Sequence, residues 1–291
     1  MGGGDPADTC GFRQFALLQE DQFLKIRAIA SPVAQAPRNL KANRNSLMSI
    51  DAVDVKSRAK VAYELMEHPW PAADIWSTHT KHCIADFVHE FAGNAQGLVF
   101  NAGCGGNDYG LSSRAPCFNL DISLRQCRSL PRAVVGDVEH IPFPSDNFDI
   151  TVCVGAVINY VEPEKAIPEL IRVTKPGGLI LVDFESSCSA EIMFSRHWHK
   201  PVSVIERMYV DHMDKTYLFS PGHIRKIFER SRGEVVKVRS YHTATAMWER
   251  IFTKAHIPKA AYAIDKFASS LPGVGWLGSS VIFACRKGAA A

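Results

Sequence analysis

Seven short apolar runs between Gly97 and Lys287 constrain the fold more than any other feature of this sequence. Polar segments that are compatible with helices separate one run from the next. The first five runs are unbroken rather than alternating, which is typical of strands that helices cover on both faces. Strands and helices in alternation predict an α/β fold with a parallel, doubly wound sheet. In chain order, the runs are GLVFNA, CFNLDI, AVVGDV, FDITVCVGA, GGLILVDFE, EVVKVRSYH and SVIFACRK.

The composition is that of a globular protein with a full core. Of the 291 residues, 46% are hydrophobic and 22% are charged, and the net charge is only +3. Such a small charge gives no argument for a nucleic-acid partner. No apolar run approaches the roughly 18 residues that suggest a membrane span, and the first ten residues lack the basic-then-apolar order of a secretory signal. We therefore expect a cytoplasmic protein without a membrane partner.

The eight cysteines argue against a metal centre or a disulfide framework. They are scattered along the chain without a CxxC pair, whereas such sites cluster their cysteines at ligand-like spacing. Several lie inside apolar runs, as in TVCVGAV, where a reduced cysteine behaves as a small hydrophobe. We predict no metal site.

The first 72 residues differ from the rest and predict a helical and irregular arm. Residues 11–30 carry apolar side chains at roughly helical spacing, and residues 31–46 are rich in proline and polar residues, as in a linker. A second helical stretch is expected from near Ala59, with a pause at the sequence HPWP.

The main domain is predicted to span residues 73–291. Its first helix should resume near Ala73, and the segments near 186–219 and 243–278 are longer than plain connections. We expect both to form caps over a site, the first as a helix and hairpin. In the second, four apolar residues at helical spacing are expected to pack inward: Ile257, Ala261, Ile264 and Phe267.

A glycine-rich loop follows the first predicted strand, in LVFNAGCGGNDYG from Leu98 to Gly110. In an open parallel sheet, ligands bind beyond the carboxyl ends of the strands. Gly103 and Gly105 would let the backbone turn sharply and approach a ligand without a Cβ in the way. The loop alone is weak support, because a tight turn at a strand end has the same composition.

Two acidic residues at the ends of the next strands strengthen the case for a ligand. Asp121 ends the second run, where a carboxylate can accept both hydroxyls of a ribose, and Asp137 follows the third. No lysine or arginine lies in the glycine loop to meet a pyrophosphate. The pattern therefore indicates a nucleoside that carries little negative charge.

Four segments follow one another in the chain: NAGCGG, LDIS, GDVEHIPFPSDNFDITVCVGAVINYVE and RVTKPGGLILVDFE. With these segments in this order, the chain from about Ala73 to Lys287 resembles the class I S-adenosylmethionine-dependent methyltransferases, in their UbiE-like or "methyltransferase 11" group. The resemblance implies a Rossmann-like, seven-stranded, mostly parallel sheet with helices on both faces and an antiparallel last strand. It implies S-adenosylmethionine as cofactor and methyl transfer as activity.

The resemblance also implies a role for each motif residue. The loop from Gly103 to Gly105 would line the methionine part of the cofactor, Asp121 would bind the ribose, and Asp137 would take the adenine amino group. Val154 and Gly155 would face the sulfonium. The full set of implied cofactor-binding residues is Asn101, Ala102, Gly103, Cys104, Gly105, Asp121, Ile122, Asp137, Val138, Val154 and Gly155.

Two positions depart from the family's pattern. Asn101 stands where the group usually has an acid, and Asn107 stands where it has a last glycine. The segment from Asn107 to Pro116 is short and polar, so the first crossover should hold only a turn or two of helix. These departures leave open a catalytically silent binding module. A nicotinamide-dependent oxidoreductase is a weaker alternative, because GCGGND breaks the GxGxxG pattern that it would need.

The acceptor side is much less defined, because methyl transfer needs alignment more than it needs special residues. Tyr160, His197 and His199 are the candidates for a general base. Tyr160 could equally be a packed aromatic residue, and single histidines are more often surface residues. Trp76 and His79 could close over the methionine end. We expect a small-molecule acceptor (a metabolite, sugar or natural product) and leave a homodimer open.

Overall fold

The computed structural model describes residues 44–67, 69, 74–209, 212–252 and 257–289, and side chains within these ranges except at 44–54, 207–209 and 212–214. The chain divides into two units, residues 1–44 and 45–291, and everything below concerns the second. The amphipathic helix and the linker that the sequence predicts before residue 44 lie outside the described residues.

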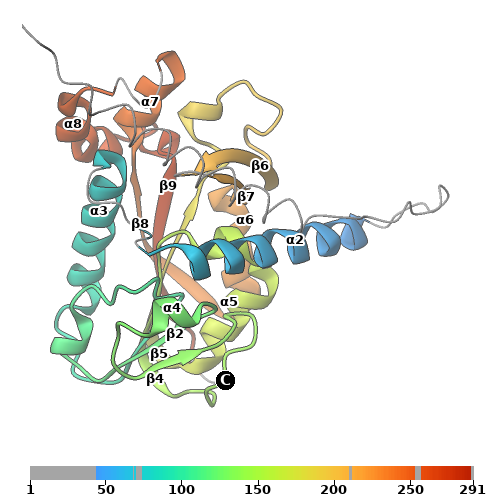
Figure 1. The fold of residues 1–291 in the computed structure, drawn as a ribbon. Coiled ribbons are helices and arrows are strands. Elements are labelled where there is room, and N and C mark those ends of the chain that lie inside the picture. The colour runs from blue at the N-terminus through green and yellow to red at the C-terminus, as the bar shows by residue number, and fades with distance from the viewer. Residues whose placement is uncertain (1–43, 68, 70–73, 210–211, 253–256, 290–291) are drawn as a thin grey trace, which may run out of the picture. The chain divides into compact units, whose positions relative to one another are not determined.

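The seven predicted runs form one seven-stranded sheet in the order β3-β2-β1-β4-β5-β9-β8 (Figure 1). The five strands from β3 to β5 are mutually parallel, and β9 runs antiparallel to both of its neighbours. The predicted Rossmann-like sheet with an antiparallel last strand is confirmed. The strands are β1 (Val99–Ala102), β2 (Cys117–Asp121), β3 (Ala133–Val135), β4 (Phe148–Cys153), β5 (Thr174–Glu185), β8 (Gly233–Tyr241) and β9 (Ser280–Lys287).

Helices cover the two faces of the sheet through separate apolar cores. On one face, α5 (Pro163–Val173) and α6 (Pro221–Arg230) pack against alternate strand residues such as Phe100. On the other face, α3 (Ile75–Ala92) buries Ile84 and Phe87 against neighbours such as Val99. Since successive strand residues point to opposite faces, the unbroken apolar runs are what two covered faces require.

Local capping fixes where these helices begin. Ser220 caps α6 by accepting a hydrogen bond from the His223 N–H, and Pro221 occupies the first helical position. Asp74 caps α3 in the same way, accepting from the N–H groups of Trp76 and Ser77. The first crossover between β1 and β2 holds a single 3-10 turn, η1 (Leu111–Ser113), which confirms the expected short connection.

The helix before α3 begins earlier than predicted. It is α2 (Arg44–Leu65), whereas the sequence analysis expected a start near Ala59. Its apolar residues are spread around the helix instead of forming one stripe, so the periodicity that marks an amphipathic helix is missing. The linker predicted over residues 31–46 was therefore wrong for residues 44–46, which belong to α2.

The segment after β5 contains the predicted hairpin, but among its described residues a 3-10 turn stands where a helix was also expected. The turn, η3 (Ala190–Ile192), precedes a two-stranded antiparallel sheet of β6 (Val202–Tyr209) and β7 (His212–Phe219). Two more short elements lie in the connections between strands. The helix α4 (Leu124–Cys127) lies between β2 and β3, and the 3-10 turn η2 (Val157–Tyr160) follows β4.

The segment between β8 and β9 forms α7 (Thr243–Ile251), α8 (Lys259–Ser270) and η5 (Gly275–Leu277). The expected inward packing was wrong for two residues, because Ile264 and Phe267 are exposed while Ala261 is buried. Buried Asp265 explains the orientation: its carboxylate accepts the N–H groups of His242 and Ala244, 2.7 and 2.9 Å away. These bonds turn the Ala261–Asp265 face of α8 inward. Within the described residues, no helix combines the length and apolar character needed to cross a bilayer.

Candidate functional site

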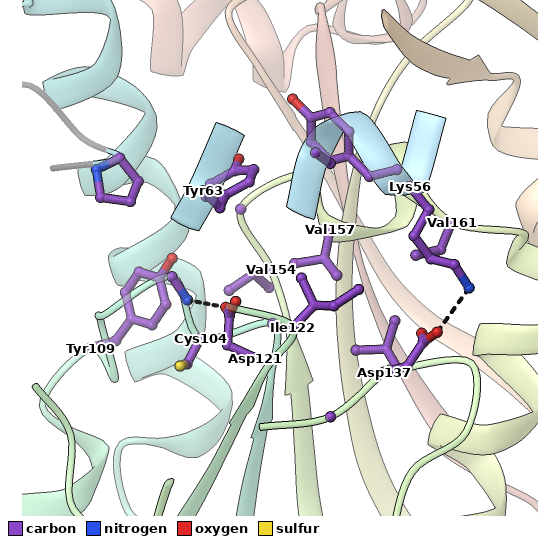
Figure 2. Close-up of a pocket in the computed structure, with 18 residues that line it drawn as sticks. Lys56, Tyr63, Cys104, Tyr109, Asp121, Ile122, Asp137, Val154, Val157 and Val161 are labelled. Carbon is purple, nitrogen blue, oxygen red and sulfur yellow. Dashed lines mark hydrogen bonds and ion pairs between the residues drawn. The ribbon is translucent and has the colours of Figure 1, made fainter. Parts of the chain in front are cut away.

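A pocket opens at the carboxyl edge of the sheet, over the ends of β1, β2, β3 and β4 (Figure 2). Its empty space, including open solvent at the mouth, is about 700 Å³. We call its strand-end residues the floor and the α2 residues Lys56, Ala59 and Tyr63 the roof. The floor comprises Gly103, Cys104, Gly105, Asp121, Ile122, Gly136, Asp137, Val138, Val154 and Gly155.

Gly103 and Gly105 of the first loop have different surroundings. Gly103 (φ +70°) has no room for a side chain, since a Cβ there would lie 2.4 Å from a methyl group of Val157. Gly105 (φ +51°) is the opposite: a Cβ would meet nothing within 4 Å, and the residue lines the pocket. A side chain at Gly105 would therefore project into space that a ligand can use.

Asp121 joins this loop to the second strand. Its carboxylate accepts the backbone N–H of Gly105 at 2.8 Å and that of Ser123 at 2.9 Å. Burial raises the pKa of Asp121, and the two N–H bonds oppose that rise. A carboxylate can accept about four hydrogen bonds, so both oxygens keep capacity for the hydroxyls of a ribose.

The third strand's acid is paired with the roof. The Nζ atom of Lys56 lies 2.8 Å from Asp137 and 2.5 Å from Glu139. Desolvation acts to lower the pKa of Lys56, but these two carboxylates hold it above its ordinary value. The ion pairs therefore tie α2 to the end of β3.

The roof is the part of the site that the sequence analysis missed. Lys56, Ala59 and Tyr63 follow one another at spacings of three and four, so they share one face of α2. The ring of Tyr63 meets that of Tyr160 edge to face, with centroids 6.0 Å apart. The spacing of Lys56, Ala59 and Tyr63 could have indicated a helix face from the sequence. It was not recognised, because the apolar residues of this helix follow no regular pattern.

The turn after β4 is held from beneath by a buried carboxylate. Gly155 and Ala156 both adopt positive φ, at +92° and +61°. Asp183, only 1% exposed, accepts the Ala156 N–H at 2.9 Å and the Tyr241 hydroxyl at 2.6 Å. Burial raises the pKa of Asp183 to about 6. A negative charge at neutral pH is thus placed directly under the pocket wall.

Nine of the eleven residues predicted to contact the cofactor line this pocket, and Asn101 and Ala102 do not. Asn101 is buried, and its Nδ2 donates to the backbone oxygen of Asn107 at 3.0 Å and to Oδ1 of Asn119 at 2.9 Å. It therefore braces the glycine loop from below by donating two hydrogen bonds, which a carboxylate could not do.

Of the three predicted base candidates, only Tyr160 lines the pocket. His197 lies against the hairpin, with Nδ1 2.5 Å from the Ser203 hydroxyl, and desolvation together with Arg196 lowers its pKa. His199, with φ +58°, packs edge to face against Trp198. The structure gives neither histidine a contact with the pocket.

Trp76 and His79 also lie outside the pocket. Trp76 stacks on the buried ring of His242, with centroids 3.7 Å apart and planes 5° apart. The Nε2 atom of His79 lies 3.0 Å from Asp265. Both residues belong to the packing between α3 and the segment after β8.

Two groups of potential metal ligands occur among the described residues, and both have partners already. In the group of His79, Cys83 and Asp265, the carboxylate is bonded to the backbone at the start of α7. In the other group, Asp137 and Glu139 with His140, Lys56 forms an ion pair with each of the two acids. Neither carries an argument for a metal.

The described residues fit the nucleoside and methionine parts of S-adenosylmethionine. Gly105 supplies open room for close approach, Asp121 has spare acceptor capacity, and Ile122 and Val138 offer apolar walls. The floor has no cation for a phosphate, and the single lysine comes from the roof. This donor set matches the cofactor of the family that the sequence resembles.

Comparison with known proteins supports the same assignment. Residues 100–182 match the family model described as a methyltransferase domain. Among curated proteins, the demethylmenaquinone methyltransferase of Paenarthrobacter aurescens (strain TC1) is 42% identical over 52 residues, which are 18% of this chain and 21% of the relative. The ubiquinone/menaquinone biosynthesis C-methyltransferase UbiE of Vibrio vulnificus (strain YJ016) is 32% identical over 80 residues, 28% and 27% of the two chains.

The chain thus spans about a fifth to a quarter of the length of these curated relatives. Solved structures extend the likeness of the fold. A proposed S-adenosylmethionine-dependent methyltransferase from Listeria monocytogenes aligns with 72% of this chain and 99% of its own, at 10% identity and a TM-score of 0.51. The PH0226 protein from Pyrococcus horikoshii OT3 aligns with 78% and 99%, at 11% identity and a TM-score of 0.51.

The four motifs, the strand order and the matched domain agree on one family, and the predicted recognition is confirmed. By these motifs, residues 100–182 form a methyltransferase domain of the class I S-adenosylmethionine-dependent type, within a sheet that has that fold.

Proposed function

We propose that this protein transfers the methyl group of S-adenosylmethionine to a small organic acceptor. The observation that carries the proposal is the floor itself, where the Gly105 N–H and the Asp121 carboxylate meet at 2.8 Å beside open pocket space. When bound, the cofactor supplies an electrophilic methyl group on a positively charged sulfur. The protein's task is then to align the acceptor with that group and to exclude water.

In this proposal, the floor holds the donor. Asp121 accepts the ribose hydroxyls, Asp137 the adenine amino group, and Ile122 with Val138 flank the ring. The loop at Gly105 approaches the methionine part. These assignments are supported by the lining of the pocket and remain part of the proposal.

The electrostatics of the site compensate for the missing family acid. Asn101 brings no charge, but Asp183 places a buried carboxylate beneath Gly155 and Ala156. An ionised carboxylate there favours a cationic sulfur over a neutral one. Its bond from Tyr241 and its bond from the Ala156 N–H keep it in place.

The walls favour an acceptor with an apolar or aromatic body over a sugar. Beyond the floor, the pocket is lined by Tyr63, Tyr109, Tyr160, Val157 and Pro69, and aromatic walls suit planar, weakly charged molecules. Tyr160 is the base candidate that lies nearest to such an acceptor. The similar curated proteins are named for quinone biosynthesis, which agrees with this class. The cytoplasmic location and the homodimer stay predictions.

The proposal is tested by incubating the purified protein with S-adenosylmethionine and separate panels of phenols and quinols, aliphatic amines and sugars. Mass spectrometry follows methyl transfer to each acceptor. Transfer to a phenol or quinol supports the proposal, and transfer confined to sugars overturns the acceptor class. Cofactor binding by calorimetry without transfer to any acceptor would favour the silent binding module.

A further inference from the structure

The segment of α7, α8 and η5 exposes large apolar side chains, which we call the apolar face, and none of them lines the pocket. The apolar face contains seven exposed large hydrophobic residues within thirty positions of the chain: Met247, Ile251, Phe252, Ile264, Phe267, Leu271 and Trp276. In Figure 1, α7 and α8 lie side by side at the end of the sheet where β8 terminates. A monomeric protein seldom leaves so many large apolar side chains together in water.

The orientation of α8 is the reason for this exposure. The face that points into the protein holds Ala261 and the buried carboxylate of Asp265. The opposite face carries Ile264 and Phe267, which are 56% and 67% exposed. An amphipathic helix in a globular protein normally does the reverse. Since Asp265 is fixed by backbone N–H groups at the start of α7, α8 cannot rotate to bury its apolar side without losing them.

The exposed charged residues of α7 and α8 themselves are basic. Arg250, Lys259 and Lys266 are exposed beside it. The two acids of the segment are Asp265, which is buried and bonded, and Glu249, which is half-buried. The 3-10 turn η3 contacts α7. The loop after η3 carries Phe194, which is 75% exposed, and the exposed cation Arg196. Apolar side chains with a cationic rim are typical of helices that lie in a lipid interface.

We propose that α7, α8 and η5 dock the protein onto an anionic lipid surface. Phe267 and Ile264 insert among the lipid chains, while Lys259 and Lys266 meet the headgroups. A second copy of this chain fits the face less well, because a two-fold contact would bring the same cations of both copies together. The sequence analysis expected no membrane partner, because no apolar run is long enough to suggest a membrane span. This inference does not depend on the proposed methyl transfer.

The test is flotation of the full-length protein with vesicles of phosphatidylcholine alone or mixed with phosphatidylglycerol. We expect binding to the mixed vesicles, weakened by high salt because the attraction is partly between exposed charges. The double substitution Ile264→Gln with Phe267→Gln should lower the vesicle partition coefficient about tenfold or more, because it removes both inserting side chains. Lys259→Gln with Lys266→Gln should lower binding to the mixed vesicles only.

Val236→Gln is the matched control, because Val236 is an exposed apolar residue of β8 (42%) outside this face. Thermal melting checks that every variant is folded, and calorimetry with S-adenosylmethionine should give wild-type cofactor affinity for all of them. Three results would overturn the proposal: no binding to mixed vesicles, equal binding to neutral ones, or unchanged binding by the Ile264/Phe267 variant. Self-association that this variant abolishes, without vesicle binding, would assign the face to a dimer instead.

Discussion

The floor and the roof of the pocket are held in place by different kinds of interaction. The floor comes from the ends of four adjacent parallel strands, which β-sheet pairing holds in fixed register. The roof comes from one face of α2, which is held by the ion pairs of Lys56, by the ring contact of Tyr63 and by hydrogen bonds from Ser123 and Gln126 to the end of the helix. The floor has little freedom to move without unfolding the sheet, whereas the roof is held by side-chain contacts and, among the described residues, has no backbone pairing to the sheet.

This difference predicts that changes in the floor abolish or reshape ligand binding, while changes in the roof only weaken it. Exposed or half-buried ion pairs contribute little to stability, typically below about 1 kcal/mol. A backbone that must approach a ligand, by contrast, tolerates no added side chain. Substitutions in each part can test the ranking.

The largest effect is expected for Gly105→Val. Its side chain would occupy the open space above the loop, and a branched residue at φ +51° is strained by about 1–3 kcal/mol. Binding of S-adenosylmethionine should fall below detection in calorimetry, with only a moderate loss of thermal stability. Gly177→Val is the matched control, since Gly177 also has positive φ (+77°) and empty surroundings but lies outside the pocket. If both variants bind normally, the loop is merely a turn.

Asn101→Asp should lower stability without improving binding. The new carboxylate would face the Asn107 oxygen and Oδ1 of Asn119, both of which now accept hydrogen bonds from Asn101. Burying it unpaired should cost roughly 2–4 kcal/mol in the free energy of unfolding. Because the charged form is the disfavoured one, its pKa would rise in the folded state, so the loss should grow as pH increases above about 4. Denaturant melts at several pH values measure this. A more stable variant that binds S-adenosylmethionine more tightly would contradict our account of Asn101.

Asp183→Asn should reduce discrimination between the sulfonium cofactor and its neutral product, S-adenosylhomocysteine. Asp183 is buried, and losing its attraction for a cationic sulfur should cost roughly 1–2 kcal/mol at an effective dielectric near 20, so the affinity ratio should fall about tenfold. With a pKa of about 6, wild-type Asp183 becomes protonated as pH drops from 7 to 5. The wild-type ratio should fall over this window, and that of Asp183→Asn should stay flat.

Tyr241→Phe is the companion variant, because it keeps the carboxylate but removes the 2.6 Å bond that lowers the pKa of Asp183. The pKa of Asp183 should rise, so the fall of the affinity ratio should occur at higher pH than in the wild type. Identical ratios in wild type and Asp183→Asn across the whole pH range would refute a role for this carboxylate in selecting the charged cofactor.

The smallest effect is expected for Lys56→Gln, in the roof. It leaves Asp137 and Glu139 without their cation, so affinity for S-adenosylmethionine should fall about two- to fivefold, or about 0.5–1 kcal/mol. Lys165→Gln removes a comparable but exposed pair with Glu162 and should change nothing. A loss as large as that of Gly105→Val would mean that roof and floor are equally essential.

The sequence predicted the sheet, because unbroken apolar runs leave few other ways to bury two strand faces. It also predicted most of the floor, since strand ends, glycines and acids fall at fixed points of the pattern. It could not predict α2, whose apolar residues make no stripe, or the direction of α8, which Asp265 sets through bonds to backbone 21 and 23 residues away. The role of Asp183 was hidden for a similar reason: Ala156 follows β4 and Tyr241 ends β8, so both partners are distant in sequence.

The central claim is that the floor binds S-adenosylmethionine through Asp121. Calorimetric titration of the wild type and of Asp121→Ala, with S-adenosylmethionine and with NAD, tests it most directly. We expect the wild type to bind S-adenosylmethionine and not NAD. The variant should lose about 1.5–3 kcal/mol of cofactor binding, or roughly ten- to a hundredfold, through its lost charged acceptor. A wild type that binds no S-adenosylmethionine, or a folded Asp121→Ala that binds it as tightly as the wild type, would contradict the claim.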